Sequence, residues 1–213
     1  AEGGRRLKAI VGELLLLIKE GVSTKKIDDR AEELVEKQGG KSSFKTVPGY
    51  HWTICSPINE QVVHTKPCDR ILKKGDVLTL DIGLLYQGFH TDYAITKVVG
   101  ESKNIKINKF LKTGEETLYK AIKEAKIGNR IGHISEVIEK EIKGNGYFII
   151  KELTGHGIGK KLHEDPYVLG FVDLPVDRSP IIKKGLVIAI EIIYAMGTEE
   201  IAYEEDNWSI ITK

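Results

Sequence analysis

Two apolar runs of this chain each carry one carboxylate among their aliphatic residues. Residues 77–83 read VLTLDIG and contain Asp81, and residues 187–193 read VIAIEII and contain Glu191. Runs of this length and composition predict buried strands. An ionised carboxylate in a buried strand costs several kcal/mol unless it is neutralised. Neither run contains Lys or Arg, so each carboxylate has to be protonated or to meet a cationic side chain or a metal ion, unless both acids lie at strand ends and face water.

Two histidines follow in a glycine-rich stretch, residues 154–166, which reads TGHGIGKKLHEDP. His156 and His163 are seven positions apart, and an imidazole can both bind a metal ion and transfer a proton at neutral pH. A histidine in a glycine-rich turn can also be a hydrogen-bonded structural residue. A third acid, Asp92, follows Asp81 by eleven positions, after a predicted turn. Taken together with Glu191, these residues favour a metal site.

The composition is typical of a compact soluble enzyme. The chain has 213 residues, of which 41% are hydrophobic, and 32 basic residues nearly balance 31 acidic ones. A net charge of +1 gives no electrostatic reason to expect a nucleic acid or a membrane as partner. The two cysteines, Cys55 and Cys68, form no disulfide framework, which favours the reducing cytoplasm. The aliphatic run at residues 14–18 is too short to span a bilayer.

Apolar residues at helical spacing predict four helices. The first begins near Leu7 and continues to Gly21, and the second is capped by Ser23 or Thr24. The third and fourth cover residues 108–125 and 131–143, and a strand hairpin is predicted over residues 77–99.

The second and fourth helices share a pattern at an offset of 107 residues. Gly21, Ile27 and Gly39 fall on Gly128, Ile134 and Gly146. Two amphipathic helices can match in this way by chance. A true repeat predicts two similar halves, residues 1–106 and 107–213, each with helices on one side and a hairpin on the other, and a ligand site where the halves meet.

The two ends of the chain lack the signals that usually delimit a fold. The chain begins with Ala1, and the first predicted helix has no capping residue. It ends directly after the strand-like run of residues 207–212. We expect residues to be missing at both ends.

Several of these motifs together resemble the type I methionine aminopeptidases over essentially the whole chain. They are NEQVVH at residues 59–64, DIG at 81–83, TD at 91–92, the glycine–histidine stretch at 154–166, Glu191, and DNW at 206–208. The resemblance implies the pita-bread fold, an α/β fold of the α+β type in which two similar halves, related by a pseudo-twofold axis, pack helices outside a curved antiparallel sheet. Residues 1–213 would then form a single catalytic domain lacking its C-terminal strand and a second glutamate ligand.

The resemblance also implies the chemistry. Two divalent ions (Co, Mn, Fe or Zn) would be held by Asp81, Asp92, His156 and Glu191, and a hydroxide bridging them would attack the first peptide bond. His163 would face the carbonyl oxygen that becomes an oxyanion, and His64 the peptide nitrogen. From the sequence alone, His64 can also be a strand-end imidazole bonded to backbone.

The implied reaction is removal of the initiator methionine from nascent chains in the cytoplasm, with transient ribosome contact. The pocket for the methionine side chain would be lined by Tyr50, Cys55 and Trp208, although Cys55 can also be ordinary core packing. Thr65 and Ile192 depart from the family pattern, which usually has Gly and Pro there. Two alternatives remain at this point: a binding module that has lost catalysis, and a related peptidase specific for proline.

Overall fold

The computed structural model describes residues 1–213, and its internal contacts divide the chain into two compact units. The first unit consists of Ala1–Lys103, Gly159–Leu162 and Ala202–Ile211. The second consists of Asn104–Ile158, His163–Ile201 and Thr212–Lys213. Each unit therefore contains segments that are distant in the sequence.

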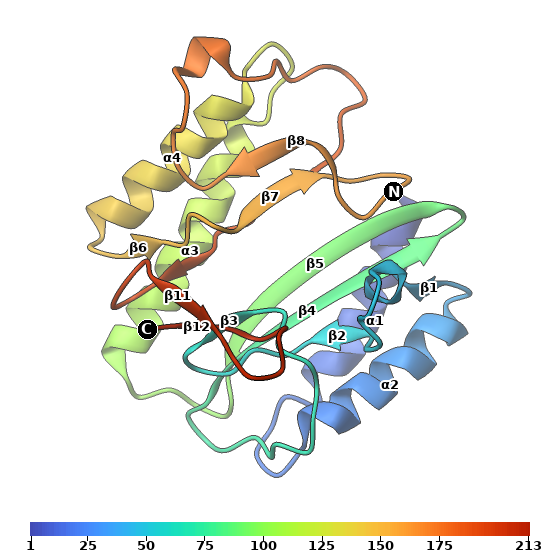
Figure 1. Ribbon diagram of the computed structural model, residues 1–213. Coiled ribbons are helices and arrows are strands. Elements are labelled where there is room, and N and C mark those ends of the chain that lie inside the picture. Colours follow the sequence, from blue (N-terminus) through green and yellow to red (C-terminus); the bar gives the residue numbers. More distant parts are fainter. The chain divides into compact units, whose positions relative to one another are not determined.

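Helices α1 (Glu2–Leu15) and α2 (Thr24–Lys37) of the first unit pack against a four-stranded sheet, as Figure 1 shows. The strand order is β1 (Lys41–Ser42), β4 (Val77–Tyr86) and β2 (Ile54–Cys55), and β5 (Phe89–Val98) also pairs with β4. All three partners run antiparallel to β4. The central strand β4 therefore organises this unit.

One face of β4 forms the core of the first unit. Leu78, Leu80, Ile82 and Leu84 are completely buried and belong to one cluster with the apolar faces of α1 and α2. Side chains alternate between the two faces of a strand, so every second residue points to the helices. Each such side chain contributes about 1.5–3 kcal/mol through its burial. Asp81, between Leu80 and Ile82, points to the opposite face.

The hairpin predicted over residues 77–99 is confirmed. Strands β4 and β5 are joined by a two-residue turn in which Gln87 and Gly88 have positive φ of 50° and 78°. Such turns match the right-handed twist of the flanking strands. The strand β4 continues to Tyr86, so Asp81 lies within it rather than at its end.

The second helix begins as predicted, whereas the first ends earlier. Ser23 caps α2, since its side chain accepts a hydrogen bond from the Lys26 backbone N–H at 3.2 Å. Helix α1 ends at Leu15, and the prediction that it reaches Gly21 is wrong. Gly21 has a φ of +85° and donates its N–H to the Leu72 carbonyl, so it is part of a turn that pairs with a distant segment.

A small sheet completes the first unit. It has the order β11 (Ile201–Tyr203), β12 (Ile210–Thr212) and β3 (Gln61–Val63), and a 3-10 helix, η1 (Phe44–Thr46), precedes the segment that carries Tyr50. The pairing of β12 with β3 is antiparallel and places Ile210 opposite Val63.

The second unit packs α3 (Ile105–Glu124) and α4 (Ile131–Gly144) beside short strands. One sheet has the order β8 (Glu164–Leu169), β7 (Thr154–Gly157) and β9 (Ile188–Ala189), the other pairs β6 (Phe148–Ile149) with β10 (Tyr194–Ala195), and a 3-10 helix, η2, covers Val176–Arg178. The buried face of α4 has helical spacing and consists mainly of Ile131, Ile134, Ile138 and Ile142. Helix α3 buries small residues, and a Cβ on Gly114 would lie 2.5 Å from the Tyr194 hydroxyl.

The predicted buried strand over residues 187–193 is wrong in its extent. Only Ile188–Ala189 pairs in the ladder, as β9. The run is apolar because Leu186, Ile188, Ile190 and Ile192 pack against the core of the second unit. Val187, on the alternate side, is 61% exposed. Glu191 belongs to that alternate set, so it does not enter the core.

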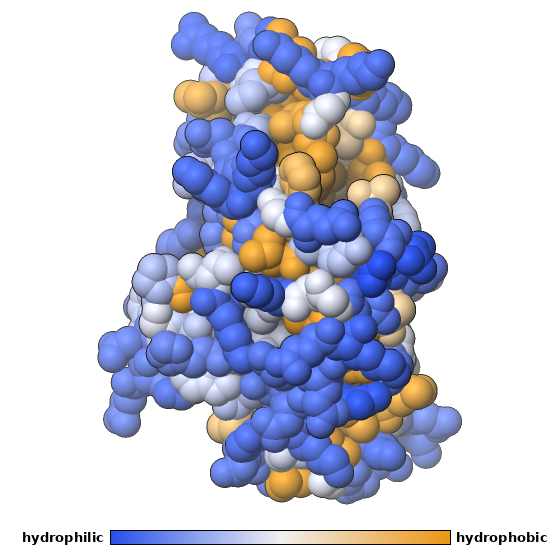
Figure 2. All heavy atoms as spheres, turned by 90° about the vertical axis from the view of Figure 1, so that its right-hand side faces the viewer, coloured by the Kyte–Doolittle hydropathy of each residue, from blue (hydrophilic) through white to orange (hydrophobic).

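The molecular surface is mostly hydrophilic on the face shown in Figure 2, where hydrophobic side chains gather in small groups. None of the helices is both long enough and apolar enough to cross a membrane.

Candidate functional site

The two predicted aspartates lie on the same face of the sheet in the first unit. Asp81 of β4 is opposite Ala94 of β5, and Asp92 of β5 is opposite Gly83 of β4. Residues opposite each other point to one face, and so do residues two apart on one strand. Asp81 and Asp92 are therefore diagonal neighbours on the face turned away from the helices. Both are partly buried, as metal-binding carboxylates commonly are.

Cys55 lies beside Asp81 on the same face, because β2 pairs with β4 in a register that places these two residues opposite each other. The Tyr50 hydroxyl donates to the Ile54 carbonyl at 2.8 Å, and its oxygen lies 3.1 Å from the Cys55 sulfur. Burial, with the nearby charge of Asp81, raises the pKa of the Cys55 thiol, and burial raises the pKa of Tyr50 as well. Both groups therefore stay neutral and apolar in character at physiological pH.

Trp208 also packs against Tyr50. Their ring centroids are 5.1 Å apart with an interplanar angle of 73°, an edge-to-face arrangement. Tyr50 thus contacts both of the other residues predicted to line the methionine pocket, and one of these, Cys55, is opposite Asp81. A Cβ on Gly49 would lie 3.4 Å from the Trp208 ring.

His64 follows β3 directly and is exposed. Its φ is +57°, in the left-handed region that non-glycine residues seldom adopt. Such a conformation turns the chain sharply at the end of the strand. His64 is therefore placed by a turn, whereas Asp81, Asp92 and His156 lie within paired strands.

In the second unit, strand β7 holds His156 between β8 and β9. His156 is buried and lies opposite Ala189. Its Nδ1 is 2.8 Å from the Gly157 carbonyl oxygen, which can only accept, so Nδ1 is protonated. Nε2, the other ring nitrogen, lies 3.3 Å from Oε1 of Glu191.

His163 lies against His156 in the same unit. The ring centroids are 4.4 Å apart and the planes meet at 79°. His163 is exposed, whereas His156 is buried. The buried imidazole of His156 therefore contacts both the accessible imidazole of His163 and the Glu191 carboxylate.

Two glycines make this arrangement possible. A Cβ on Gly155 would lie 2.4 Å from the Ala189 carbonyl oxygen, and one on Gly157 would lie 2.3 Å from the Asp165 carbonyl oxygen. Real Cβ contacts are never so short, so glycine is needed where β8 and β9 approach β7 closely. This approach brings Glu191 within reach of His156.

The predicted metal ligands thus form two pairs, Asp81 with Asp92 and His156 with Glu191. Within either unit, no group of three or more His, Cys, Asp or Glu side chains is arranged to hold a metal ion. The donor types nevertheless fit a divalent transition metal, because carboxylates and a neutral imidazole are the ligands that such ions take. A hydrogen bond that fixes the tautomer of a ligating histidine is also a usual feature of metal sites.

One residue that positions the segment around Cys55 was not recognised in the sequence. Asp28 of α2 accepts the backbone N–H groups of Thr53 and Ile54 at 2.8 and 3.0 Å, directly before Cys55. Burial raises the pKa of Asp28. Such a bond joins residues 25 positions apart, so only the folded chain reveals it. The DNW motif did point to the turn that carries Trp208.

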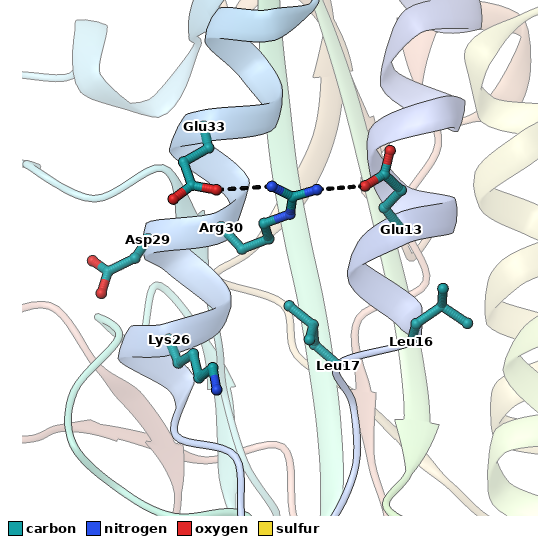
Figure 3. A pocket seen from close by; sticks show the side chains of 7 residues that line it. All are labelled: Glu13, Leu16, Leu17, Lys26, Asp29, Arg30 and Glu33. Carbon is teal, nitrogen blue, oxygen red and sulfur yellow. Dashed lines mark hydrogen bonds and ion pairs between the residues drawn. The ribbon is translucent and has the colours of Figure 1, made fainter.

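A groove of about 440 Å³ lies elsewhere in the first unit, between α1 and α2 (Figure 3). Figure 3 shows the Arg30 guanidinium between the carboxylates of Glu13 and Glu33, with N–O distances of 2.7 and 2.8 Å. None of the predicted site residues lines this groove. It is therefore separate from the candidate site.

Comparisons with known proteins agree with these observations. Residues 2–210 match the profile of metallopeptidase family M24. Methionine aminopeptidase 1 of Bacillus subtilis is 38% identical over 211 residues, which cover 99% of this chain and 84% of that protein. The crystal structure of a methionine aminopeptidase from Thermotoga maritima superposes with a TM-score of 0.95 at 31% identity, covering 99% of this chain and 84% of that one.

A prolidase from Pyrococcus furiosus superposes with a TM-score of 0.76 at 23% identity, covering 90% of this chain and 56% of that one. That likeness shows a common fold alone, and it does not favour the proline-specific alternative. The predicted pita-bread fold is confirmed by these structures. The chain belongs to metallopeptidase family M24 and, within it, to the methionine aminopeptidases, which are metal-dependent hydrolases.

Proposed function

We propose that this chain removes the N-terminal methionine from nascent proteins with two divalent metal ions held by Asp81, Asp92, His156 and Glu191. The observation that carries the proposal is the His156–Glu191 pair. The Nδ1–H of His156 is engaged by the Gly157 carbonyl, and Nε2 faces the Glu191 carboxylate at 3.3 Å. This is the state in which a histidine binds a metal.

The chemical types of the four proposed ligands limit which metal ions can bind. Three carboxylates and one imidazole suit Mn²⁺, Fe²⁺, Co²⁺ or Zn²⁺. Such a pair of ions, when bound, supplies an activated water and polarises the scissile carbonyl. Asp81 and Asp92 hold their carboxylates side by side on a rigid strand pair, which favours ligation by both.

The two accessible histidines are assigned to the substrate. His163 lies against His156, so a carbonyl oxygen bound near the metals comes within reach of its imidazole, which stabilises the developing negative charge. His64 is assigned to the peptide nitrogen, where it positions the bond to be broken. Its exposed position at the end of β3 is consistent with contact to a substrate.

Tyr50, Cys55 and Trp208 are proposed to bind the methionine side chain. A thioether packs favourably against aromatic rings and neutral sulfur. Both Tyr50 and Cys55 are neutral, because burial raises the pKa of each. The pocket therefore presents an apolar, polarisable surface beside Asp81.

The proposed partners are protein N-termini that begin with methionine, met in the cytoplasm and in transient contact with the ribosome. A net charge of +1 favours neither direct nucleic-acid recognition nor membrane binding. Cosedimentation with ribosomes at low and at high salt tests the contact. Absence of binding at low salt would remove the ribosome from the proposal.

The reaction is tested with the peptide Met-Ala-Ser. Protein stripped of metal should release methionine only after Mn²⁺, Fe²⁺, Co²⁺ or Zn²⁺ is added, and His156→Ala should abolish the release. His133→Ala is a matched control, because His133 lies in the same unit and bonds only its own helix cap, Arg130. Release that persists in His156→Ala, or that needs no metal, would contradict the proposed ligand.

A further inference from the structure

The chain contains two tryptophans, and both pack against Tyr50. The Trp52 centroid is 5.4 Å from that of Tyr50 with an interplanar angle of 67°, and the Trp208 centroid is 5.1 Å away at 73°. Both contacts are edge-to-face. Tyr50 itself is buried, whereas both tryptophans are half-buried. The position of Tyr50 therefore depends on what holds the two indole rings.

Asp206 holds the segment that carries Trp208. Its Oδ1 accepts the backbone N–H of Trp208 at 2.9 Å and that of Ser209 at 2.7 Å, and its Oδ2 accepts the Ser209 hydroxyl at 2.8 Å. Asn207, within this turn, has a positive φ of 58°. A turn that is fastened by three bonds to one carboxylate has little freedom, so the Trp208 ring leaves the backbone in a fixed direction.

Lys66 connects this turn to the other tryptophan. Its Nζ lies 3.7 Å from Oδ2 of Asp206 and 5.8 Å from the centroid of the Trp52 ring. The ammonium group thus lies between an anion and an indole face, where it is attracted to both. Lys66 and Asp206 are 140 positions apart in the sequence and belong to the same unit.

We propose that Asp206 and Lys66 form a clamp that positions Trp208 and Trp52 around Tyr50 and so sets the selectivity of the pocket for unbranched side chains. The inference rests on the proposed function, because Tyr50 and Trp208 are assigned there to the methionine side chain. Asp206 and Lys66 are positioning residues, since they act through the aromatic rings and do not touch substrate.

Loosening the clamp changes binding and not the chemical step. The rings that face the methionine side chain lose their fixed orientation, while the proposed metal ligands keep theirs. Loss of ground-state contacts raises KM with little change in kcat. A less rigid wall also excludes branched side chains less strictly, because discrimination needs a pocket that cannot adapt.

The kinetic test compares Asp206→Ala, Asp206→Asn and Lys66→Met with the unmodified chain on Met-Ala-Ser and Leu-Ala-Ser. Asp206→Ala should raise KM for Met-Ala-Ser about tenfold and leave kcat within about twofold. A tenfold loss of affinity is what the loss of one well-oriented aromatic contact typically causes. Asp206→Asn keeps the acceptor for both N–H groups and should recover most of the loss. Lys66→Met should raise KM about threefold.

The matched control is Asp76→Ala. Asp76 lies in the same unit and also accepts a backbone N–H, that of Lys73 at 2.9 Å, but it contacts none of the aromatic residues. It should leave KM and the preference for methionine unchanged. A fall in kcat at constant KM in Asp206→Ala, or an equal effect in Asp76→Ala, would overturn the clamp.

Intrinsic fluorescence gives a second readout that needs no substrate. Trp52 and Trp208 are the only tryptophans, so acrylamide quenching reports on the clamp alone. Quenching should increase in Asp206→Ala and Lys66→Met and stay unchanged in Asp76→Ala. Unchanged quenching in both clamp variants would refute the clamp. If the unmodified protein does not cleave Met-Ala-Ser, the proposed function fails, and the quenching experiment still decides whether the clamp exists.

Discussion

Replacing Gly155 with alanine should destabilise the second unit and weaken the metal binding that we propose for His156. The new Cβ would lie 2.4 Å from the Ala189 carbonyl oxygen, 3.2 Å from the Glu191 nitrogen and 3.3 Å from the Val168 Cβ. The first of these contacts is with backbone, which cannot rotate away. Strand β9 therefore has to move, and with it the segment that leads to Glu191.

The size of the effect follows from overpacking. Forcing a methyl group into a closed site costs about 1–3 kcal/mol. For a chain of this length, that loss lowers Tm by about 2–12 °C. Thermal unfolding followed by circular dichroism measures the change. Titration calorimetry with Mn²⁺ measures the second effect, a lower affinity than that of the unmodified protein, since the Glu191 carboxylate is displaced from Nε2 of His156.

Gly144→Ala is the matched control. Gly144 is the last residue of α4 in the same unit, and a Cβ there would meet nothing within 4 Å. Alanine at a helical position is more favourable than glycine by up to about 1 kcal/mol, so this variant should be as stable as the unmodified chain or slightly more stable. The argument from close strand approach is refuted if Gly155→Ala has the same Tm and Mn²⁺ affinity as Gly144→Ala.

Three further predictions concern stability, each read from urea unfolding. Asp28→Ala removes the acceptor of two backbone N–H groups and should cost about 1–3 kcal/mol; an unchanged midpoint would contradict the role of that carboxylate. For Asp206, partial burial is outweighed by hydrogen bonds from Ser209 and Trp208, so its pKa is lowered; its stabilisation is fully present above the usual value of 3.8 and is lost as pH falls below it. Asp206→Asn should therefore be less stable than the unmodified chain at pH 7, and this difference should shrink as pH falls below 3.8; a constant difference would be inconsistent with the lowered pKa. Ile82→Ala, at a completely buried position of β4, should cost about 2–5 kcal/mol, and a loss below 1 kcal/mol would show that the core is not closed there.

The sequence correctly predicted those structural elements that are determined by residues close together in the chain. The hairpin follows from a two-residue turn at Gln87 and Gly88, and the start of α2 follows from the Ser23 cap. Both depend on residues only a few positions apart. The end of α1 was mispredicted because Gly21 serves a turn that pairs with Leu72, a residue that no local pattern connects to it.

The candidate site was predictable in its residue types. A carboxylate within an apolar run indicates a charge that has to be neutralised in the folded protein. Asp81 and Glu191 were singled out as candidates for this reason. The environment of Glu191 was not predictable, because only alternate residues of its run enter the core. The assignment of Asp81, Asp92, His156 and Glu191 as ligands, and the half-repeat at residues 1–106 and 107–213, stay predictions.

The contact between Asp206 and Lys66 could not be predicted from the sequence. Asp206 was part of the DNW motif, but no pattern connected it to Lys66, and the proximity of these two residues depends on strands β12 and β3 being paired. Pairing of that kind is decided by the whole fold. The residues proposed to touch a ligand could therefore be named from the sequence, whereas the contacts of the residues that position them could not.

The pairing of β3 with β12 also has a consequence for biosynthesis. Val63 finds its partner Ile210 only after 147 further residues have been made. During translation, β4, β5, α1 and α2 can assemble as soon as they leave the exit tunnel, while β3 has to wait without a neighbour on that side. Contacts between such distant segments slow folding, and an unpaired strand is open to wrong partners. The segment that carries His64 therefore stays open to wrong pairing until Ile210 has been made.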